Sequence, residues 1–342
     1  MRYRGKRWCF RVVVAVVCWL LATAAGNPDV KRYQLTGYAQ GTTYAVTYYA
    51  DDHVVSKAAI DSVLAVIDSS MSLYKPHSLI NRINDAEGAM RVTDEHFRRV
   101  LQCSFEIYRR SGGLFDITVA PLVQLWGFGV EAQNGLPDSA AVDQALQCVG
   151  MDKIRVRGKR VIKRYPCVQL DMNGIAQGYS VDVLATHLES HGVTAYLVEL
   201  GGELRIKGPK PDGTPFRVGI ERPTTVETED VVVDDVVEIT EGAITTAGSY
   251  RKFLQDENRR ISHHINPKTG YPLATGIISA TVYSRDAMTA DGYDNVIMAM
   301  PMADAISFVD RFKEMEAFIV YRDEQGVVKD TMTVGFKQLI TN

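Results

Sequence analysis

The chain has 342 residues, of which 46% are hydrophobic and 23% are charged, and its formal net charge is −3 at pH 7. This composition predicts a soluble globular protein with a substantial core, built as one large domain or two interleaved ones. The acidic balance argues against a nucleic-acid-binding protein.

The first 25 residues predict a secretory signal peptide. Five basic residues precede an apolar run over residues 12–25, which ends in small residues and is too short to span a bilayer comfortably. Removing these five charges, with no acidic residue among them, changes the formal charge from −3 to −8. We therefore expect an exported, periplasmic protein. The alternative is cleavage before Cys18 and lipidation of its thiol, which would anchor the protein to the inner membrane, although Val17 fits that alternative poorly.

Cleavage near Ala25 leaves three cysteines, Cys103, Cys148 and Cys167. Three thiols cannot all pair within one chain, and their wide spacing matches no metal-binding pattern. The sequence therefore predicts buried thiols that pack as small hydrophobic residues.

The remaining sequence mixes predicted strands and helices without a regular βαβ rhythm. A strand is expected over 44–49, a helix begins at Ser56, and a second helix runs from a Thr93 cap to Gly112. Further helices are expected at 138–148, 174–191, 290–300 and 303–312. Further strands are expected on both sides of a turn at 157–159, at 167–170, 196–200, 204–207, 216–221 and 236–240, and in a hairpin turning at 325–326. This order favours an α+β fold of mixed sheets with packed helices.

Residues 289–295 hold the most informative pattern. With Thr289 as the N-cap, Asp291, Asp294 and Asn295 stand at positions i, i+3 and i+4 and share one helix face. Two carboxylates and an amide oxygen suit Mg²⁺, which usually shares its shell with substrate phosphates. The alternative is that these acidic residues only stabilise a helix N-terminus through its dipole.

Residues 171–179 place a glycine-containing turn between a strand and a helix. Such a turn presents backbone N–H groups to a phosphate, although most turns of this kind are structural. The spacing matches neither a P-loop nor a dinucleotide fingerprint, which removes the usual support for an ATPase or a hydride-transfer enzyme.

Two histidines, His263 and His264, precede a proline and glycine turn. A histidine near neutral pH is suited to act as a general base if it reaches an attacking hydroxyl. The alternative, a histidine satisfied within its loop, is favoured for His264. Neither histidine has the spacing of a helical zinc site.

Residues 114–119 and 125–129 are unusually aromatic for a glycine-bearing stretch. They could form a wall against a flat ring. Packing in the core is the default alternative.

Taken together and in this order, these motifs resemble the ApbE family, the FAD:protein FMN transferases. The resemblance begins at residues 37–42 and reaches the 289–295 helix, so it covers nearly all of residues 26–342. Between these ends it is carried by short motifs at 71–78, 115–119, 171–182, 198–203, 246–250 and 262–272.

The resemblance implies an ApbE-like flavin transferase domain over residues 26–342 and a set of site residues. Mg²⁺ would be held by the backbone oxygen of Ala176 and by the side chains of Asp291, Asp294 and Asn295. His263 would be the catalytic base. The flavin nucleotide would contact Gln40, Tyr74, Leu114, Phe115, Asp116, Asn173, Tyr179 and Ile265.

The implied reaction moves FMN from FAD to a threonine or serine hydroxyl of a target flavoprotein and releases AMP. In this family the target is a subunit of a redox-driven membrane pump or a related flavoprotein. Two alternatives stay open. One is an FAD pyrophosphatase in which water replaces the hydroxyl, and the other is a non-catalytic lipoprotein that binds and carries FAD.

Five positions depart from the pattern of the family. Asn173 replaces a usual glycine, Gln177 a lysine, Gln40 a methionine, Asn266 an aspartate and Asn295 a threonine or serine. The missing lysine removes a positive charge near the diphosphate, so weaker binding of FAD is expected. An amide oxygen still suits magnesium, and the predicted metal site is therefore preserved.

Overall fold

A computed structural model describes residues 30–131, 133, 135–223, 231–249, 253–256 and 259–341. The predicted signal peptide, with Cys18, lies outside the described residues, so its cleavage and its lipidation stay predictions. Across the described ranges, no helix combines the length and the apolar character needed to cross a membrane.

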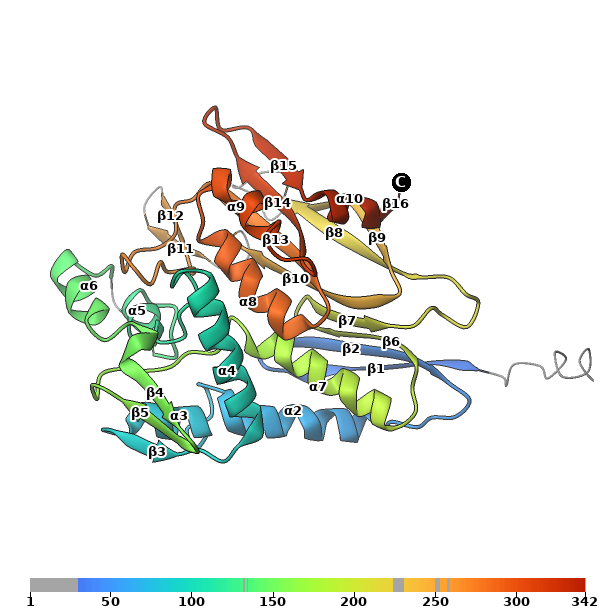
Figure 1. The fold of residues 1–342 in the computed structure, drawn as a ribbon, viewed down its shortest axis with the longest axis horizontal. Coiled ribbons are helices and arrows are strands. Elements are labelled where there is room, and N and C mark those ends of the chain that lie inside the picture. The colour runs from blue at the N-terminus through green and yellow to red at the C-terminus, as the bar shows by residue number, and fades with distance from the viewer. Residues whose placement is uncertain are drawn as a thin grey trace, which may run out of the picture.

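The centre of the molecule is an eight-stranded sheet (Figure 1). Each strand pairs with its neighbour in antiparallel register. In order across the sheet, the strands are β1 (Lys31–Ala39), β2 (Thr42–Ala50), β6 (Ala195–Leu200), β7 (Glu203–Lys207), β10 (Glu241–Gly248), β13 (Ile277–Ser284), β14 (Glu316–Arg322) and β15 (Val328–Met332).

Helices cover one face of this sheet (Figure 1). Helix α7 contacts β6 and β7, and α8 contacts β10 and β13, so these two helices lie side by side over the middle strands. Their apolar side chains join those of the sheet in two buried clusters, which supply the main hydrophobic stabilisation. The covering helices are α2 (Lys57–Met71), α4 (Glu95–Arg110), α7 (Ala176–Ser190), α8 (Ala287–Met298) and α9 (Met302–Val309).

The opposite face is covered by a small three-stranded antiparallel sheet and one short helix. Val218 and Val237 of this sheet pack with Phe318 of β14 and Phe336 of the helix in a third buried cluster. The elements are β8 (Phe216–Pro223), β9 (Val231–Ile239), β16 (Ile340–Thr341) and α10 (Val334–Leu339).

The remaining elements form an outlying region at the left of Figure 1. They are α3 (Leu79–Asp85), β3 (Ala89–Arg91), α5 (Ala120–Leu125), α6 (Ser139–Leu146), a 3-10 turn at Met151–Lys153, the hairpin of β4 (Ile154–Arg157) and β5 (Arg160–Lys163), and a second hairpin of β11 (Phe253–Asp256) and β12 (Arg259–Ser262). Together with the layered sheets, these elements confirm the predicted α+β fold.

Two predicted features of the chain path are wrong. The α4 cap is Asp94 rather than Thr93, because the Asp94 Oδ1 atom accepts a hydrogen bond from the Phe97 N–H at 2.7 Å. The stretch 167–170 is not a regular strand, since only a single parallel bridge joins Gln169 to Val119. Most other predicted elements are confirmed, and Ser56 caps α2 by accepting from the Ala59 N–H.

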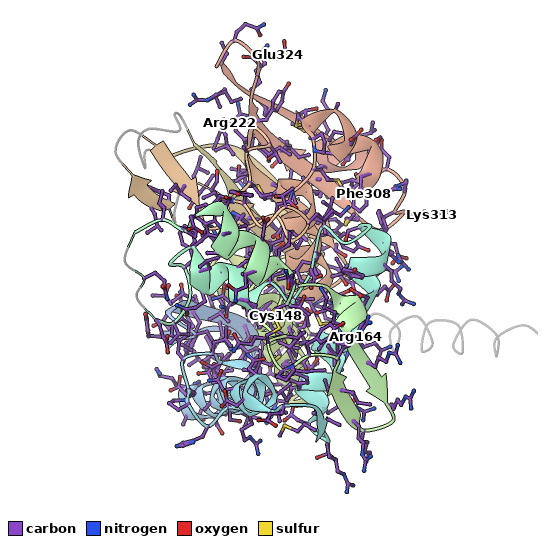
Figure 2. The ribbon with its side chains drawn as sticks, turned by 90° about the vertical axis from the view of Figure 1, so that its left-hand side faces the viewer. Cys148, Arg164, Arg222, Phe308, Lys313 and Glu324 are labelled. Atoms are coloured by element: carbon purple, nitrogen blue, oxygen red, sulfur yellow. A yellow bond between two sulfur atoms is a disulfide. The ribbon has the colours of Figure 1, made fainter. Side chains whose placement is uncertain are left out.

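The prediction for the cysteines is wrong for two of the three. Cys148 and Cys167 form a disulfide, with 5.5 Å between their Cα atoms, and Cys148 lies in the outlying region (Figure 2). Cys103 is a free, half-buried thiol. The prediction failed because it took an odd number of cysteines as evidence against a disulfide. Two of three cysteines can pair and leave the third as a free thiol. Export, where disulfides persist, was the available signal.

Candidate active site

Segments that are far apart in the sequence meet around a pocket of about 970 Å³. The pocket lies beside the N-terminus of α7 and the middle of α8, which the sheet holds in place. Among the predicted site residues, all but one line it: Gln40, Tyr74, Leu114, Phe115, Asp116, Asn173, Ala176, His263, Ile265, Asp291, Asp294 and Asn295.

Tyr179 is the predicted site residue that the structure places elsewhere. Its ring is buried in the core, and its hydroxyl lies 2.8 Å from His96 Nδ1. These contacts hold the side chain between α7 and α4, in a second cavity away from the main pocket. Tyr179 is close to the turn at residues 171–177 in the sequence, but its side chain does not line the main pocket.

The acidic residues of α8 do not stand at its N-terminus, and Thr289 is not the cap. The cap is Asp286, whose Oδ1 atom accepts from the Thr289 N–H at 2.8 Å, so the helix begins one turn earlier than predicted. Asp291 and Asp294 therefore lie in the second turn, and Asn295 in the third. Because the helix dipole acts mainly within the first turn, it does not explain these carboxylates.

Asp291 and Asp294 are buried, with 4% and 1% of their surface exposed. Burial raises the pKa of Asp291 to about 7. Burial, and then repulsion by Asp291, raise the pKa of Asp294 well above its ordinary value. Two neighbouring carboxylates held in a dry site are costly to charge, and a bound cation offsets that cost.

Hydrogen bonds fix this cluster against α7. The Gly178 N–H donates to Asp291 Oδ2 at 2.8 Å, and Asn295 Nδ2 donates to Asp294 Oδ1 at 2.9 Å and to the Gly174 carbonyl at 3.4 Å. A side chain at Gly178 would collide with the backbone of Ala287 and with Asp291, so glycine permits the close approach of the helices. The Ala176 carbonyl is thereby brought to the same pocket.

The pocket is strongly acidic. Lys75 is the single lysine or arginine among the described residues that line it, and its Nζ atom lies 3.2 Å from Asp68. Six lining carboxylates face this one cation: Asp68, Asp116, Asp171, Glu203, Asp291 and Asp294. The sequence interpretation missed Lys75, although its place directly after Tyr74 was an available signal. A diphosphate entering this pocket would meet repulsion unless a cation accompanied it.

The donor set on α7 and α8 fits Mg²⁺. Two carboxylates, an amide and a backbone carbonyl are all oxygen ligands, and the three side chains share one helix face. The hydrogen bonds of Asn295 use its nitrogen, and a ligand role would use its oxygen. Within the described part of the chain, no group of three or more His, Cys, Asp or Glu side chains is placed to hold a metal. An ion here would therefore need water or substrate oxygens as well.

Both histidines line the pocket, with ring centres 4.0 Å apart. The His264 Nδ1 atom lies 3.3 Å from Ser262 Oγ, and burial lowers the pKa of His264 well below its ordinary value. His264 is therefore neutral near pH 7. The half-exposed His263 packs edge-on against Phe128, with 6.2 Å between the ring centres.

An apolar wall lines another part of the pocket. We use this name for Leu114, Phe115, Ile117, Val119, Val123 and Phe128. Asp116 supports the wall, because its carboxylate accepts hydrogen bonds from the Thr118 N–H at 2.8 Å and the Met151 N–H at 3.1 Å. Burial raises the pKa of Asp116, and these hydrogen bonds oppose that effect. Trp126 lies behind the wall and donates from Nε1 to the Gly270 carbonyl at 2.7 Å.

Gln40 occupies a tight turn that lines the same pocket as Asp291, Asp294 and Asn295. Its φ of 52° is the one positive value recorded for a non-glycine residue in the described ranges. Its Nε2 atom donates to Ser180 Oγ at 2.9 Å, and Ser180 Oγ donates to the Ala176 carbonyl at 2.7 Å. The glutamine that replaces a usual methionine therefore reaches the predicted carbonyl ligand through one hydroxyl.

Comparisons with known proteins identify the family of the chain. The ApbE family model matches residues 40–319. The FAD:protein FMN transferase of Vibrio cholerae serotype O1 is 34% identical, over 96% of this chain and 98% of its own length, and that of Haemophilus influenzae is 31% identical, over 95% and 96%. The structure of the flavin transferase ApbE from Vibrio cholerae superimposes with a TM-score of 0.83 at 30% identity, covering 91% of this chain and all of that one.

A second structure, the flavinyl transferase ApbE of Pseudomonas stutzeri in its apo form, has a TM-score of 0.81 at 30% identity, over 91% of this chain and 97% of its own. Fold and site together define a transferase enzyme. The chain belongs to the ApbE family, which confirms the resemblance of its motifs.

Proposed function

We propose that this enzyme transfers FMN from FAD to the hydroxyl of a threonine or serine side chain in a target flavoprotein, with Mg²⁺, and releases AMP. The observation that carries the proposal is the acidic lining of the pocket, where, among the described residues, six carboxyl groups accompany one lysine. FAD would add a negatively charged diphosphate. Such a ligand requires a divalent cation, and Asp291 and Asp294 present buried oxygens suited to one.

In the proposed reaction the acceptor hydroxyl oxygen attacks the FMN-side phosphorus, the bond from that phosphorus to the AMP oxygen breaks, and AMP leaves. His263 takes the proton of the attacking hydroxyl. Asp291, Asp294, Asn295 and the Ala176 carbonyl would hold Mg²⁺, which would supply the positive charge that neutralises and orients the diphosphate. Catalysis then depends mainly on positioning and electrostatics.

The chain's other pocket residues bind and orient the substrate. The apolar wall packs against the flat flavin ring. In the turn at residues 171–177, the N–H groups of Asp171, Asn173, Ile175 and Ala176 already have acceptors within the protein, so the Gly174 and Gln177 amides are the ones that we assign to the phosphates. Gln177, in the place of a usual lysine, contributes no positive charge there. We therefore expect the metal to carry a larger share of phosphate binding than it does in relatives with the lysine.

We also propose that the enzyme acts in the periplasm, on an acceptor flavoprotein subunit of a membrane redox pump. The Cys148–Cys167 disulfide supports an oxidising compartment, since such bonds are rare in the cytosol. A lipid anchor to the inner membrane through Cys18 is the alternative to simple export.

Release of AMP from FAD tests the proposal. We expect AMP with Mg²⁺ and acceptor, no AMP with EDTA, and a rate reduced roughly 10²- to 10³-fold by Asp291→Asn, because that variant weakens binding of the cation that stabilises the diphosphate. Asp304→Asn, at an exposed position of α9, is the matched control and should behave as the wild type.

Three results would redirect the proposal. If EDTA and Asp291→Asn both leave the rate unchanged, the metal role is wrong. Free FMN in place of a flavin-labelled acceptor band would make the enzyme an FAD pyrophosphatase. FAD that binds without any release of AMP would make the protein a carrier.

A further inference from the structure

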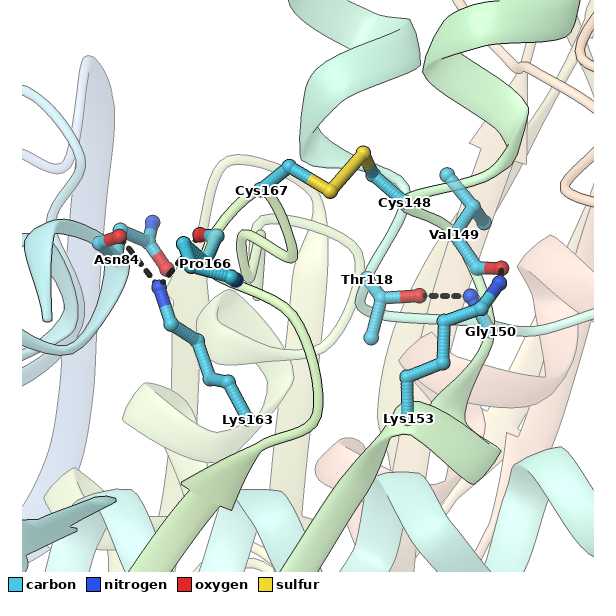
Figure 3. The surroundings of a disulfide bond; sticks show 9 residues. All are labelled: Asn84, Thr118, Cys148, Val149, Gly150, Lys153, Lys163, Pro166 and Cys167. Carbon is cyan, nitrogen blue, oxygen red and sulfur yellow. Dashed lines mark hydrogen bonds between the residues drawn. A yellow bond between two sulfur atoms is a disulfide. The ribbon is translucent and has the colours of Figure 1, made fainter. Parts of the chain in front are cut away.

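The Cys148–Cys167 disulfide joins two segments that both contact residues 114–119, the first stretch of the apolar wall. The two cysteines are separated by 19 positions, and the loop between them contains the β4–β5 hairpin. Figure 3 shows the bond bridging the two chain segments at the base of this hairpin. The disulfide therefore closes a ring against which residues 114–119 lie.

The first segment, residues 148–151, holds the wall through its side chains. The Gly150 N–H donates to Thr118 Oγ1 at 2.6 Å, and the Met151 N–H donates to Asp116 Oδ2 at 3.1 Å. The Thr118 hydroxyl in turn donates to Asp116 Oδ1 at 2.5 Å. Both acceptors are buried, so loss of these donors would leave polar groups without water to replace them.

The second segment, residues 167–171, holds the backbone of the wall. The Asp171 N–H donates to the Ile117 carbonyl at 2.7 Å, and Gln169 pairs with Val119 in a parallel bridge. Asp171 begins the turn that leads to Asn173 and Ala176. A shift of this segment would therefore move the wall and the phosphate turn together.

Two lysines of the hairpin region donate hydrogen bonds to backbone carbonyls next to the two cysteines (Figure 3). Lys153 Nζ donates to the Val149 carbonyl. The buried Lys163 Nζ donates to the Asn84 carbonyl at 2.6 Å and to the Pro166 carbonyl at 3.1 Å. Neither lysine links one segment to the other, whereas the disulfide does.

We propose that the Cys148–Cys167 disulfide is a positioning element of the active site, which holds the apolar wall in the geometry that binds the flavin ring. The inference rests on the proposed function, because the ring is taken to bind at this wall. With the bond intact, both flanking segments are fixed relative to each other. With the bond broken, the two segments stay joined through the β4–β5 hairpin and through their hydrogen bonds to residues 114–119, and those hydrogen bonds to the wall open more readily.

The test compares oxidised and reduced full-length protein. Dithiothreitol breaks the S–S bond to give two thiols and is itself oxidised to a cyclic disulfide. We expect the dissociation constants of FAD and riboflavin to rise about tenfold on reduction, which corresponds to a loss of about 1.4 kcal/mol of contact with the wall. Removal of the reductant and reoxidation should restore both values, and the Mg²⁺ concentration for half-maximal AMP release should stay unchanged.

Cys103→Ser is the matched control, since it removes the free thiol and leaves the disulfide, and it should keep the full response to dithiothreitol. The pair Cys148→Ser and Cys167→Ser should reproduce the reduced state without reductant. If that pair fails to fold, the reversible reduction of the wild type carries the test. A reduced protein that melts at a lower temperature but binds riboflavin as before would overturn the proposal and make the bond only a stabilising crosslink. Loss of the response in Cys103→Ser would overturn it too.

Hydrogen exchange separates this inference from the proposed function, because it needs no flavin. Reduction should speed exchange at the Gly150, Met151 and Asp171 amides and leave the Gly178 amide, which donates to Asp291, protected. Unchanged exchange at the three wall amides contradicts the positioning role even if FMN transfer is demonstrated. Faster exchange in a protein that binds no FAD would contradict the proposed function alone.

Discussion

The acidic cluster on α8 and the apolar wall line the same pocket but are built in different ways. Asp291 and Asp294 stand in the middle of a helix packed against α7 and the central sheet, and a glycine brings the two helices together. The wall is formed largely by loops and short helices of the outlying region, held by buried hydrogen bonds and a disulfide.

The difference matches what the proposed function requires of each part. A metal ion tolerates little displacement of its ligands, and a regular helix fixes ligand spacing closely. A flat ring needs a surface rather than single atoms, and loops provide one if they are tied down. The two parts should therefore fail separately, so that one class of change harms phosphate chemistry and another harms ring binding.

Asp294→Asn should give the largest effect, and only on phosphate chemistry. We expect AMP release to fall roughly 10²- to 10³-fold, as for loss of a preorganised electrostatic group. In EDTA the same variant should be more stable by about 1 to 3 kcal/mol, because a buried, uncompensated carboxylate becomes a neutral group of the same shape. Riboflavin, which lacks phosphates, should bind as it does to the wild type. AMP release and urea unfolding measure the two effects.

A variant that is both inactive and less stable in EDTA would show that Asp294 serves the fold rather than the ligand. Asp294→Asn can be compared directly with the wild type, because the hydrogen bond with Asn295 is retained. Asn at position 294 still offers an Oδ1 atom to the Asn295 Nδ2 donor, so that hydrogen bond is retained.

The secondary structure was predictable where the spacing of apolar residues clearly followed the period of a helix or of a strand. The apolar stripe after Ser56 and the alternating strand residues near Tyr44 gave elements close to those observed, because burial follows the local period. The strand predicted at 167–170 is wrong, although its residues are typical of strands. The segment is held instead by a single β-bridge, by hydrogen bonds to the Asn84 side chain and by a disulfide. Those contacts come from residues distant in the sequence, which no local pattern reports.

The sequence predicted most of the residues that the structure brings together around the pocket, but not how they are set there. The spacing of Asp291, Asp294 and Asn295 gave one helix face correctly, while the true cap, Asp286, removed the competing dipole explanation. Sequence spacing also placed Tyr179 beside the phosphate turn, but its hydroxyl is taken by His96 from another helix. The excess of carboxylates in the pocket depended on the tertiary fold, because those residues come from separate segments.

The pH dependence of stability tests the contact between α7 and α8, through Asp182 of α7. Its carboxylate accepts from the Ala287 N–H at 3.0 Å and the Met288 N–H at 2.9 Å, and burial followed by repulsion from Asp286 raises its pKa to about 6. The folded protein thus binds this proton more tightly than the unfolded chain does. Stability from this group is greatest at low pH and is lost as pH rises from about 4 to about 6.

Asp182→Asn should remove that loss. Relative to the wild type, its free energy of unfolding in EDTA should increase by up to about 3 kcal/mol between pH 4 and pH 6. Urea unfolding at three pH values in this range measures it, with Asp304→Asn as an exposed control. Curves that run parallel for Asp182→Asn and the wild type would contradict the expectation. Riboflavin binding should not change, in keeping with an effect confined to the helices.

Trp126→Phe should give the smallest effect, and only on the wall. The variant keeps an aromatic side chain, although a smaller one, and loses the Nε1 donor to the Gly270 carbonyl, which ties α5 to the loop that carries Ile265. A lost hydrogen bond of about 1 kcal/mol corresponds to about fivefold weaker riboflavin binding, with the Mg²⁺ dependence unchanged. Tyr271→Phe, at the neighbouring exposed ring, is the control and should bind normally. A shift in the Mg²⁺ dependence of Trp126→Phe would show that the two parts of the pocket are coupled after all.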